Sequence, residues 1–480
     1  MNSFITIKEL KDRLESRELS LEEVIEFYRA RIEKYNPDLN AVLHKFEWDT
    51  RKSADYQDTF LRGIPGLVKS NISELDRITN CGSKFLSKYK SPYDATVINK
   101  LKNGGAVLLG KTNMDEFAMG GSGEFSAFGS TKNPWDVDRT PGGSSSGSAA
   151  AVAAGLIPWA LGTETGGSVR QPASFCGLVG LYPTYGLVSR YGVVAFASST
   201  DQVGVLSRTV YDNAMITSVI AGHDPKDSTS LPEPVRDYTK MLKGKLPKDL
   251  TIGVIKDSIE SEGVSEEVKI SFKSSVSDLE KLGAKIKYIS LPDLKYGIAV
   301  YFVLNYAEAA SNLSRFDGSI YGLRGKDATN LIDMYVNSRH DGFGAEVKRR
   351  ILVGNYVLSA KHKSELYAKA NHIRCAIRAE FEQAFRDVDL LMSPTTPNHA
   401  PKLGENVGDP IAMYLADYFN VPNCIAGMPA LSVPCGLSKN NMPIGVQFIG
   451  PRLSEDFLYQ VGHAYEQNTP HHLNVPKGYK

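Results

Sequence analysis

The stretch from Arg139 to Gly180 concentrates the residues that could carry chemistry in this sequence. It holds nine glycines and many serines around one apolar segment, and glycines gather in this way where the backbone must approach another group closely. A serine hydroxyl becomes a nucleophile only when a neighbouring base takes its proton. All 9 histidines lie outside residues 45–222, so the base for a serine in this stretch must be another residue type.

Lys69 is the candidate base, because the apolar run Gly63–Val68 precedes it and predicts burial. Burial disfavours the charged form of lysine, and a neutral lysine can accept a proton. Gly166 and Gly167 meet a second need, since glycines let consecutive backbone amides point at one developing negative charge. Ser168 ends that turn and is the candidate nucleophile. From spacing alone, a plain Gly/Ser-rich turn between a strand and a helix is an open alternative.

Three shorter motif matches favour other interpretations. Residues 105–112 satisfy the phosphate-loop pattern, but their four middle residues are apolar and predict a buried strand instead of a nucleotide site. Residues 87–90 match S-x-x-K without its companion motifs and predict a solvated turn. Residues 143–147 match G-x-S-x-G and would make Ser145 the nucleophile. That motif requires a strand directly before it, whereas the preceding loop here contains proline.

The glycine-rich and serine-rich stretch resembles the amidase signature family, whose members hydrolyse amides with a Ser, cis-Ser, Lys triad. The resemblance covers nearly the whole chain and is densest from Gly63 to Gly204. It implies that Ser168 is the nucleophile, that Ser144 is the bridging serine of a cis peptide bond, and that Lys69 is the base. The backbone amides implied for the oxyanion hole are those of Thr165, Gly166, Gly167 and Ser168.

Further motifs are similar to the glutamine-hydrolysing subunits of tRNA-dependent amidotransferases, a branch of that family. They lie at residues 110–136, 190–204, 342–356 and 409–436. Glutamine needs a pocket for its α-carboxylate and its α-ammonium. The resemblance implies Arg350 for the carboxylate, which suits the planar fork of a guanidinium, and Asp417 for the ammonium. Arg349 is adjacent, and a shift of one residue would exchange the two arginines.

This branch also implies partners. Ammonia would pass to a B subunit that binds the mischarged tRNA and activates it with ATP and magnesium, while a small C subunit braces the assembly. No cofactor or metal is expected in this chain itself. The tRNA served would be Glu-tRNA(Gln), Asp-tRNA(Asn) or both. A stand-alone amidase acting on another small amide and a catalytically silent scaffold are the alternatives.

Two residues depart from the family pattern. Ser70 follows the candidate base where the family usually has aspartate, and Glu164 stands where the signature usually has aspartate. Both neighbour positions with implied chemical roles. Hydrogen bonding around Lys69 and the signature loop is therefore expected to differ from the family, with an effect on rate and pH dependence.

The composition of the 480 residues, with 42% hydrophobic and 23% charged residues, is that of a soluble globular protein. A formal net charge of +1 gives no global electrostatic reason to bind nucleic acid or membranes. The 5 cysteines form no C-x-x-C pair and are predicted to be buried, reduced thiols. The charged N-terminal segment and the lack of a long apolar run predict a cytoplasmic protein without a membrane span.

The elements that must position these residues alternate between helix and strand patterns. Thr6 with Glu9 and Ser20 with Glu23 predict two capped N-terminal helices, the second ending at Asn36-Pro37. The alternation predicts an α/β fold, and the resemblance implies a central mixed β-sheet with helices on both faces. We expect one amidase domain over residues 1–480. Its expected parts are N-terminal helices at 1–60, the signature core at 61–250, a mainly helical insertion or lobe at 294–385, and strands and helices at 386–480 that complete the core.

Overall fold

The computed structural model describes residues 1–49 and 55–479. Within that part of the chain, one 11-stranded sheet runs in the order β1-β3-β2-β4-β6-β5-β10-β11-β9-β7-β8. The strands are β1 Val42–Lys45, β2 Pro65–Lys69, β3 Val107–Thr112, β4 Trp159–Glu164, β5 Val179–Tyr182, β6 Gln202–Ser207, β7 Thr251–Ile255, β8 Lys285–Ile289, β9 Leu390–Pro394, β10 Ala430–Leu437 and β11 Pro443–Ile449. Strand β2 is parallel to β3 and β4, and β7 is parallel to β8 and β9, whereas the other pairs are antiparallel. The sheet is therefore mixed, as expected.

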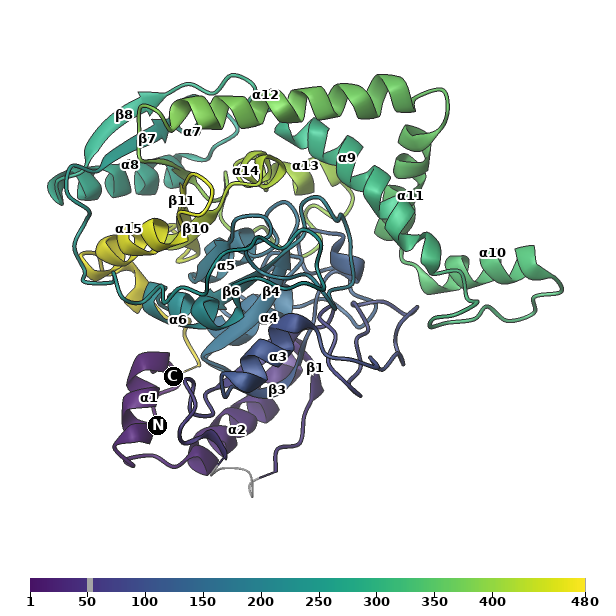
Figure 1. Cartoon of the computed structure of the whole chain (residues 1–480), viewed down its shortest axis with the longest axis horizontal. Coiled ribbons are helices and arrows are strands. Elements are labelled where there is room, and N and C mark those ends of the chain that lie inside the picture. Colours follow the sequence, from purple (N-terminus) through teal and green to yellow (C-terminus); the bar gives the residue numbers. More distant parts are fainter. Residues whose placement is uncertain (50–54, 480) are drawn as a thin grey trace.

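Helices cover both faces of this sheet (Figure 1). The helices are α1 Ile7–Glu15, α2 Leu21–Leu39, α3 Thr96–Asn103, α4 Ser146–Ala153, α5 Arg170–Cys176, α6 Val210–Ile220, α7 Asp257–Glu260, α8 Glu266–Lys281, α9 Gly297–Asn312, α10 Leu331–Gly342, α11 Ala345–Leu358, α12 Ala368–Ala384, α13 Pro410–Leu415, α14 Val421–Ala426 and α15 Glu455–Gln467. Among the described residues, none of these helices combines the length and the apolar character needed to span a bilayer.

The alternation of side chains along β10 separates the two helical layers. Leu431 and Val433 face α15, which itself packs on α6. Ser432, which lies between them in β10, pairs with Gln447 of β11. The Gln447 side chain is hydrogen-bonded to Arg170 of α5 on the opposite face. Helices α4 and α5 pack against each other on that face, so the α/β architecture with two helical layers is confirmed.

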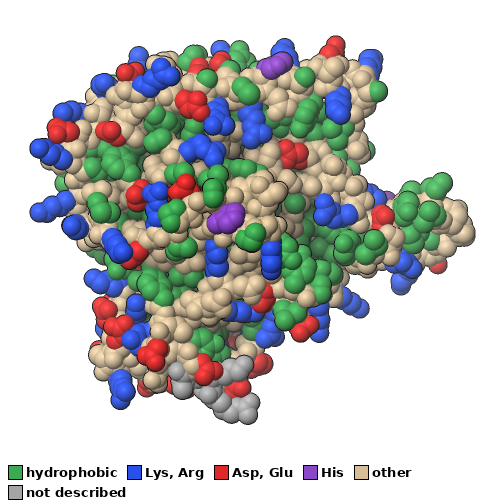
Figure 2. All heavy atoms as spheres, viewed as in Figure 1, with side chains coloured by type: hydrophobic (Ala, Val, Ile, Leu, Met, Phe, Trp, Pro, Cys, Tyr) green, Lys and Arg blue, Asp and Glu red, His purple; other side chains and the backbone are tan. Residues whose placement is uncertain are grey.

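Residues 294–385 form helices α9 to α12 outside the α5 face of the sheet. In Figure 1, α12 runs along the top of the molecule and α10 projects from its right side. Figure 2 shows hydrophobic side chains gathered on this projecting arm. The exposed apolar residues of its loop and of α10 are Ile320, Leu331, Ile332 and Val336. Helix α11 returns from the arm to the body, where it packs along α9.

The N-terminal helices differ in detail from the prediction. Helix α2 does not end at Pro37 but continues to Leu39. Pro37 cannot donate the N–H of its turn, yet the helix continues for two more residues. The side chain of Asn36 closes the helix end by accepting the N–H groups of Ala41 and Val42. The capping box of α2 is complete, whereas in α1 the Glu9 carboxylate accepts from Arg13. Residues 107–112 of the phosphate-loop match form strand β3, as predicted. The prediction that all 5 cysteines are buried is wrong for Cys375, which lies on an exposed face of α12, whereas the other four are buried.

Candidate active site

Lys69 lies at the carboxyl end of β2, a central strand whose five residues are all buried. Its neighbour Gly66 lets this strand approach the Trp159 ring of β4, because a Cβ atom at Gly66 would lie 2.1 Å from that ring. The Lys69 Nζ atom lies 2.7 Å from Ser144 Oγ, 2.9 Å from Ser145 Oγ and 3.0 Å from the carbonyl oxygen of Thr163. Strand β2 thus places the side-chain amine of Lys69 among three oxygen atoms inside the core.

Burial lowers the pKa of Lys69 to about 7, while the carboxylates of Asp115, Asp201 and Glu164 oppose this shift by raising it. An amine with that pKa is about half neutral at pH 7, so it can take up a proton under ordinary conditions. The low pKa predicted from the apolar run before Lys69 therefore has a structural cause.

Ser145 fixes the direction in which a neutral Lys69 can accept that proton. The Ser145 hydroxyl donates to the Thr163 carbonyl oxygen at 3.1 Å, so its oxygen accepts from Lys69. The same carbonyl can only accept. A neutral amine has two N–H bonds, which these two acceptors occupy, and its lone pair is left to face the Ser144 hydroxyl. The contact of Ser145 with Lys69 was not predicted from the sequence, although the adjacency of Ser145 to Ser144 could have suggested it.

Ser144, which contacts Lys69, and Ser168 come from two different segments. Ser144 follows a cis peptide bond from Gly143, and its carbonyl accepts the N–H of Asp115 at 3.2 Å. Ser168 lies in the turn between β4 and α5, and its carbonyl accepts the N–H of Ser145 at 3.2 Å. The structure thus brings the three residues implied as a triad to one end of β2 and β4.

The turn implied as the oxyanion hole is held at both ends. The Thr165 hydroxyl donates to the Asp201 carboxylate at 2.7 Å. After the turn, one oxygen of Glu164 accepts the N–H groups of Val169 and Arg170, each at 2.9 Å, and the other accepts from Arg170 Nε at 2.8 Å. Glu164, one of the two departures from the family pattern, therefore clamps the start of α5.

The N–H groups within this turn are available to a ligand. Among the described residues, no acceptor is hydrogen-bonded to the backbone N–H of Gly166, Gly167 or Ser168. Unpaired N–H groups of neighbouring residues suit the binding of a developing oxyanion. The other departure, Ser70, donates its hydroxyl to the carbonyl oxygen of Thr112 and does not touch Lys69 Nζ.

The two adjacent arginines of α11 have different surroundings. The Arg350 side chain is buried, and its guanidinium lies over the rings of Phe196, Tyr306 and Tyr414 at 5.5, 4.9 and 5.4 Å. The Arg349 side chain is 44% exposed. The two arginines bind opposite oxygens of the buried Glu346 carboxylate, Arg349 through Nη1 and Arg350 through Nε. They differ in burial, because the Arg350 side chain lies inside the protein and much of the Arg349 side chain is exposed.

Asp417 follows α13 and lies against the turn 165–168. A Cβ atom at Gly167 would lie only 1.9 Å from Asp417 Oδ1, so glycine is required for this approach. The same oxygen accepts from Asn420 Nδ2 at 3.2 Å. Loss of hydration raises the pKa of Asp417 to about 7, and the charge of Arg350 opposes that shift. A ligand cation bound here would favour the ionised carboxylate.

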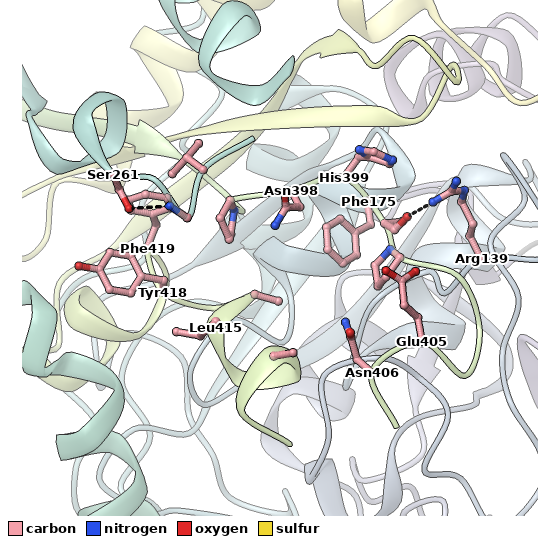
Figure 3. Close-up of a pocket in the computed structure, with 17 residues that line it drawn as sticks. Arg139, Phe175, Ser261, Asn398, His399, Glu405, Asn406, Leu415, Tyr418 and Phe419 are labelled. Atoms are coloured by element: carbon pink, nitrogen blue, oxygen red, sulfur yellow. Dashed lines mark hydrogen bonds between the residues drawn. The ribbon is translucent and has the colours of Figure 1, made fainter. Parts of the chain in front are cut away.

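A cavity of about 510 Å³ lies on the other side of α13 (Figure 3). Ala412, Leu415 and Ala416 of this segment line the cavity, opposite Arg139 and His399. The residues implied as the triad do not line it. One side of the segment 412–417 thus lines this cavity, and the other side contacts the turn 165–168 through Asp417. In the part of the chain that the structure describes, no group of three or more His, Cys, Asp or Glu residues is arranged to hold a metal ion.

Comparisons with known proteins extend over nearly the whole chain. The family model described as Amidase matches residues 23–458. The A subunit of the glutamyl-tRNA(Gln) amidotransferase from Halothermothrix orenii is 50% identical over 474 residues, which cover 98% of this chain and 99% of that protein. The crystal structure of the A subunit of the glutamyl-tRNA(Gln) amidotransferase from Thermotoga maritima is 39% identical with a TM-score of 0.83, covering 98% of this chain and 95% of that one. A 6-aminohexanoate cyclic dimer hydrolase in complex with substrate is 26% identical with a TM-score of 0.88, covering 99% of each chain.

Proposed function

The chain belongs to the amidase family, and from this premise we propose that it is the glutaminase subunit of a tRNA-dependent amidotransferase. The observation that carries the choice of glutamine is the arrangement of opposite charges around the nucleophile turn. Asp417 lies against Gly167, and the positive charges of Arg170 and Arg350 both oppose the rise in the pKa of Asp417. Arg170 is already paired with Glu164, which leaves Arg350 as the arginine for a substrate carboxylate. A substrate with an α-ammonium and an α-carboxylate matches this pair.

We assign the chemistry to three residues. Neutral Lys69 takes a proton through Ser144 from Ser168, whose Oγ attacks the side-chain amide carbon of glutamine. The resulting oxyanion is held by the backbone amides of the turn 165–168. Ammonia leaves after the proton returns through Ser144, and a γ-glutamyl ester forms on Ser168. Water then attacks this ester by the same proton route and releases glutamate.

We propose that the ammonia serves a reaction on a partner B subunit, braced by a small C subunit. The B subunit would bind the mischarged tRNA and activate it with ATP and magnesium, and this chain would need no metal or cofactor of its own. The name that the relatives carry supports Glu-tRNA(Gln) as the tRNA served, with Asp-tRNA(Asn) as the other candidate. The net charge of +1 suits a chain that leaves tRNA binding mainly to its partner in the cytoplasm.

The test is ammonia release from glutamine by the complex assembled with the B and C subunits. Ser168→Ala and Lys69→Ala should each abolish release, whereas Ser130→Ala, at an exposed serine, should leave it unchanged. Full activity of Ser168→Ala would refute the nucleophile assignment. If neither substitution lowered the glutaminase activity of the assembled complex, this chain would be a catalytically silent scaffold. Activity of the wild type should also rise when the partners and charged tRNA are added. Fast turnover of other small amides by the isolated chain, without any response to partners, would instead identify a stand-alone amidase.

A further inference from the structure

We propose that Glu346 is a positioning residue for substrate selection, because it holds Arg350 so that both Nη groups are free to take a substrate carboxylate. The proposal rests on the proposed glutaminase function and adds a residue to it. Glu346 lies in the first turn of α11, four residues before Arg350, and both side chains are 2% exposed. An acidic group in the first turn is also favoured by the helix dipole.

The hydrogen bonds of Glu346 determine which edge of the guanidinium is free. Oε1 of Glu346 accepts from Arg350 Nε at 2.8 Å. Among the described residues, neither Nη group of Arg350 has a hydrogen-bond partner in the protein. Guanidinium groups bind carboxylates best through two parallel N–H donors. Glu346 therefore uses the Nε edge and leaves the Nη1 and Nη2 pair for a ligand that brings two oxygens.

Three aromatic rings fix the plane of the same guanidinium. The rings of Phe196, Tyr306 and Tyr414 come from three separate segments and lie 4.9 to 5.5 Å from the Arg350 guanidinium carbon. Such contacts attract the cation and restrict its rotation. Burial removes hydration from the Arg350 cation, and the Glu346 carboxylate and the three rings offset this loss for the charge as a whole. The two Nη groups still have no hydrogen-bond partner among the described residues. This state is relieved when a carboxylate binds, which favours an anionic substrate group over a neutral one.

Glu346 also connects the two recognition elements. The Tyr414 hydroxyl donates to Glu346 Oε1 at 2.6 Å, and Tyr414 lies on α13, directly before the segment that carries Asp417. The start of α11 is itself anchored, since the buried Glu116 accepts the N–H of Gly344 at 2.7 Å. The carboxylate subsite and the ammonium subsite are thus joined through one buried acid.

The test compares two amides in the complex of the full chain with its B and C subunits. L-glutamine carries both α-groups, whereas 4-aminobutanamide lacks the α-carboxylate. Glu346→Gln should lower kcat/KM for glutamine by about 10- to 100-fold, mainly through KM, because a charge-assisted hydrogen bond is lost. Hydrolysis of 4-aminobutanamide should be unchanged. Tyr414→Phe should act in the same direction with a smaller effect.

Two further measurements make the outcome decisive. Glu382→Gln is the matched control, because Glu382 accepts from Arg378 Nε at 2.8 Å over the same four-residue spacing on an exposed helix face. Glu382→Gln should leave kcat/KM unchanged for both glutamine and 4-aminobutanamide. Calorimetry of glutamine binding to Ser168→Ala, with and without Glu346→Gln, should show the same 10- to 100-fold loss of affinity, about the value of one charged hydrogen bond.

The possible results separate this inference from the function on which it rests. Equal losses on both amides would show that Glu346 only supports the fold, and an unchanged KM for glutamine would show that it does not position Arg350. Either result overturns the inference and leaves the glutaminase assignment intact. A wild-type complex that hydrolyses 4-aminobutanamide but not glutamine would overturn both.

Discussion

The pKa of Lys69 predicts how glutaminase activity depends on pH, and the buried Asp115 gives a way to move it. In the proposed mechanism the neutral form of Lys69 is the active base, so kcat/KM should rise with pH through about 7. One pH unit below that pKa about one-eleventh of the amine is neutral, which predicts activity at pH 6 about 10-fold below the plateau. Asp115 is the carboxylate that most strongly raises the pKa of Lys69. Asp115→Asn should therefore lower this pKa further and move the acidic limb to lower pH.

The assay is initial ammonia release from glutamine between about pH 5.5 and 9, because kcat/KM reports the free enzyme. Compared with the wild type, Asp115→Asn should retain a larger share of its own plateau activity at pH 6, even if that plateau is lower. Asp138→Asn, at an exposed aspartate, is the control and should leave the limb in place. A limb that moves to higher pH in Asp115→Asn, or a wild-type profile that is flat through pH 7, would refute the assignment of Lys69 as the neutral base.

Two glycine substitutions test the packing that brings the site together. Gly66→Ala would place its Cβ atom 2.1 Å from the Trp159 ring and should lower the free energy of unfolding by about 1 to 3 kcal/mol in urea titration. Gly408→Ala is the control, because no atom lies within 4 Å of a Cβ atom at that position, and it should leave the free energy of unfolding unchanged. Equal free energies of unfolding for the two variants would contradict the close contact between Gly66 and Trp159. Gly167→Ala would place its Cβ atom 1.9 Å from Asp417 Oδ1 and should raise KM for glutamine about 10-fold or more, as expected when an ionic contact is displaced. An unchanged KM in a folded Gly167→Ala protein would contradict the place of Asp417 in the substrate site.

The sequence predicted features that depend on local pattern. Alternating strand and helix patterns predicted the α/β class, and the apolar run before Lys69 predicted its burial, because both depend on residues close together in the chain. The helix end at Asn36-Pro37 was wrong, since the rule for proline does not include the Asn36 side chain that closes the next turn. Local pattern specifies elements better than their ends.

Contacts between distant segments could not be predicted in this way. Glu346 and Tyr414 are 68 residues apart and meet only because α11 and α13 reach the same side of the sheet. Ser145 touches Lys69 over 76 residues, and its hydrogen bond depends on the parallel pairing of β2 with β4. Propensity and spacing carry no signal for such pairs. Local pattern likewise could not exclude a one-residue shift from Arg350 to Arg349, whereas the exposure of each side chain distinguishes them.

The division of the site between two parts of the fold has an evolutionary consequence. Lys69, Ser144 and Ser168 come from segments within residues 61–180 that are anchored in the sheet, whereas the groups proposed to meet the rest of the substrate come from α11 and from the segment that follows α13. Mutations in these outer helices can therefore alter which amide is accepted while bond cleavage is inherited unchanged. A cyclic dimer hydrolase that shares this fold at 26% identity is consistent with such a history. New specificities in this lineage should arise first in the outer helices and only rarely at the end of β2.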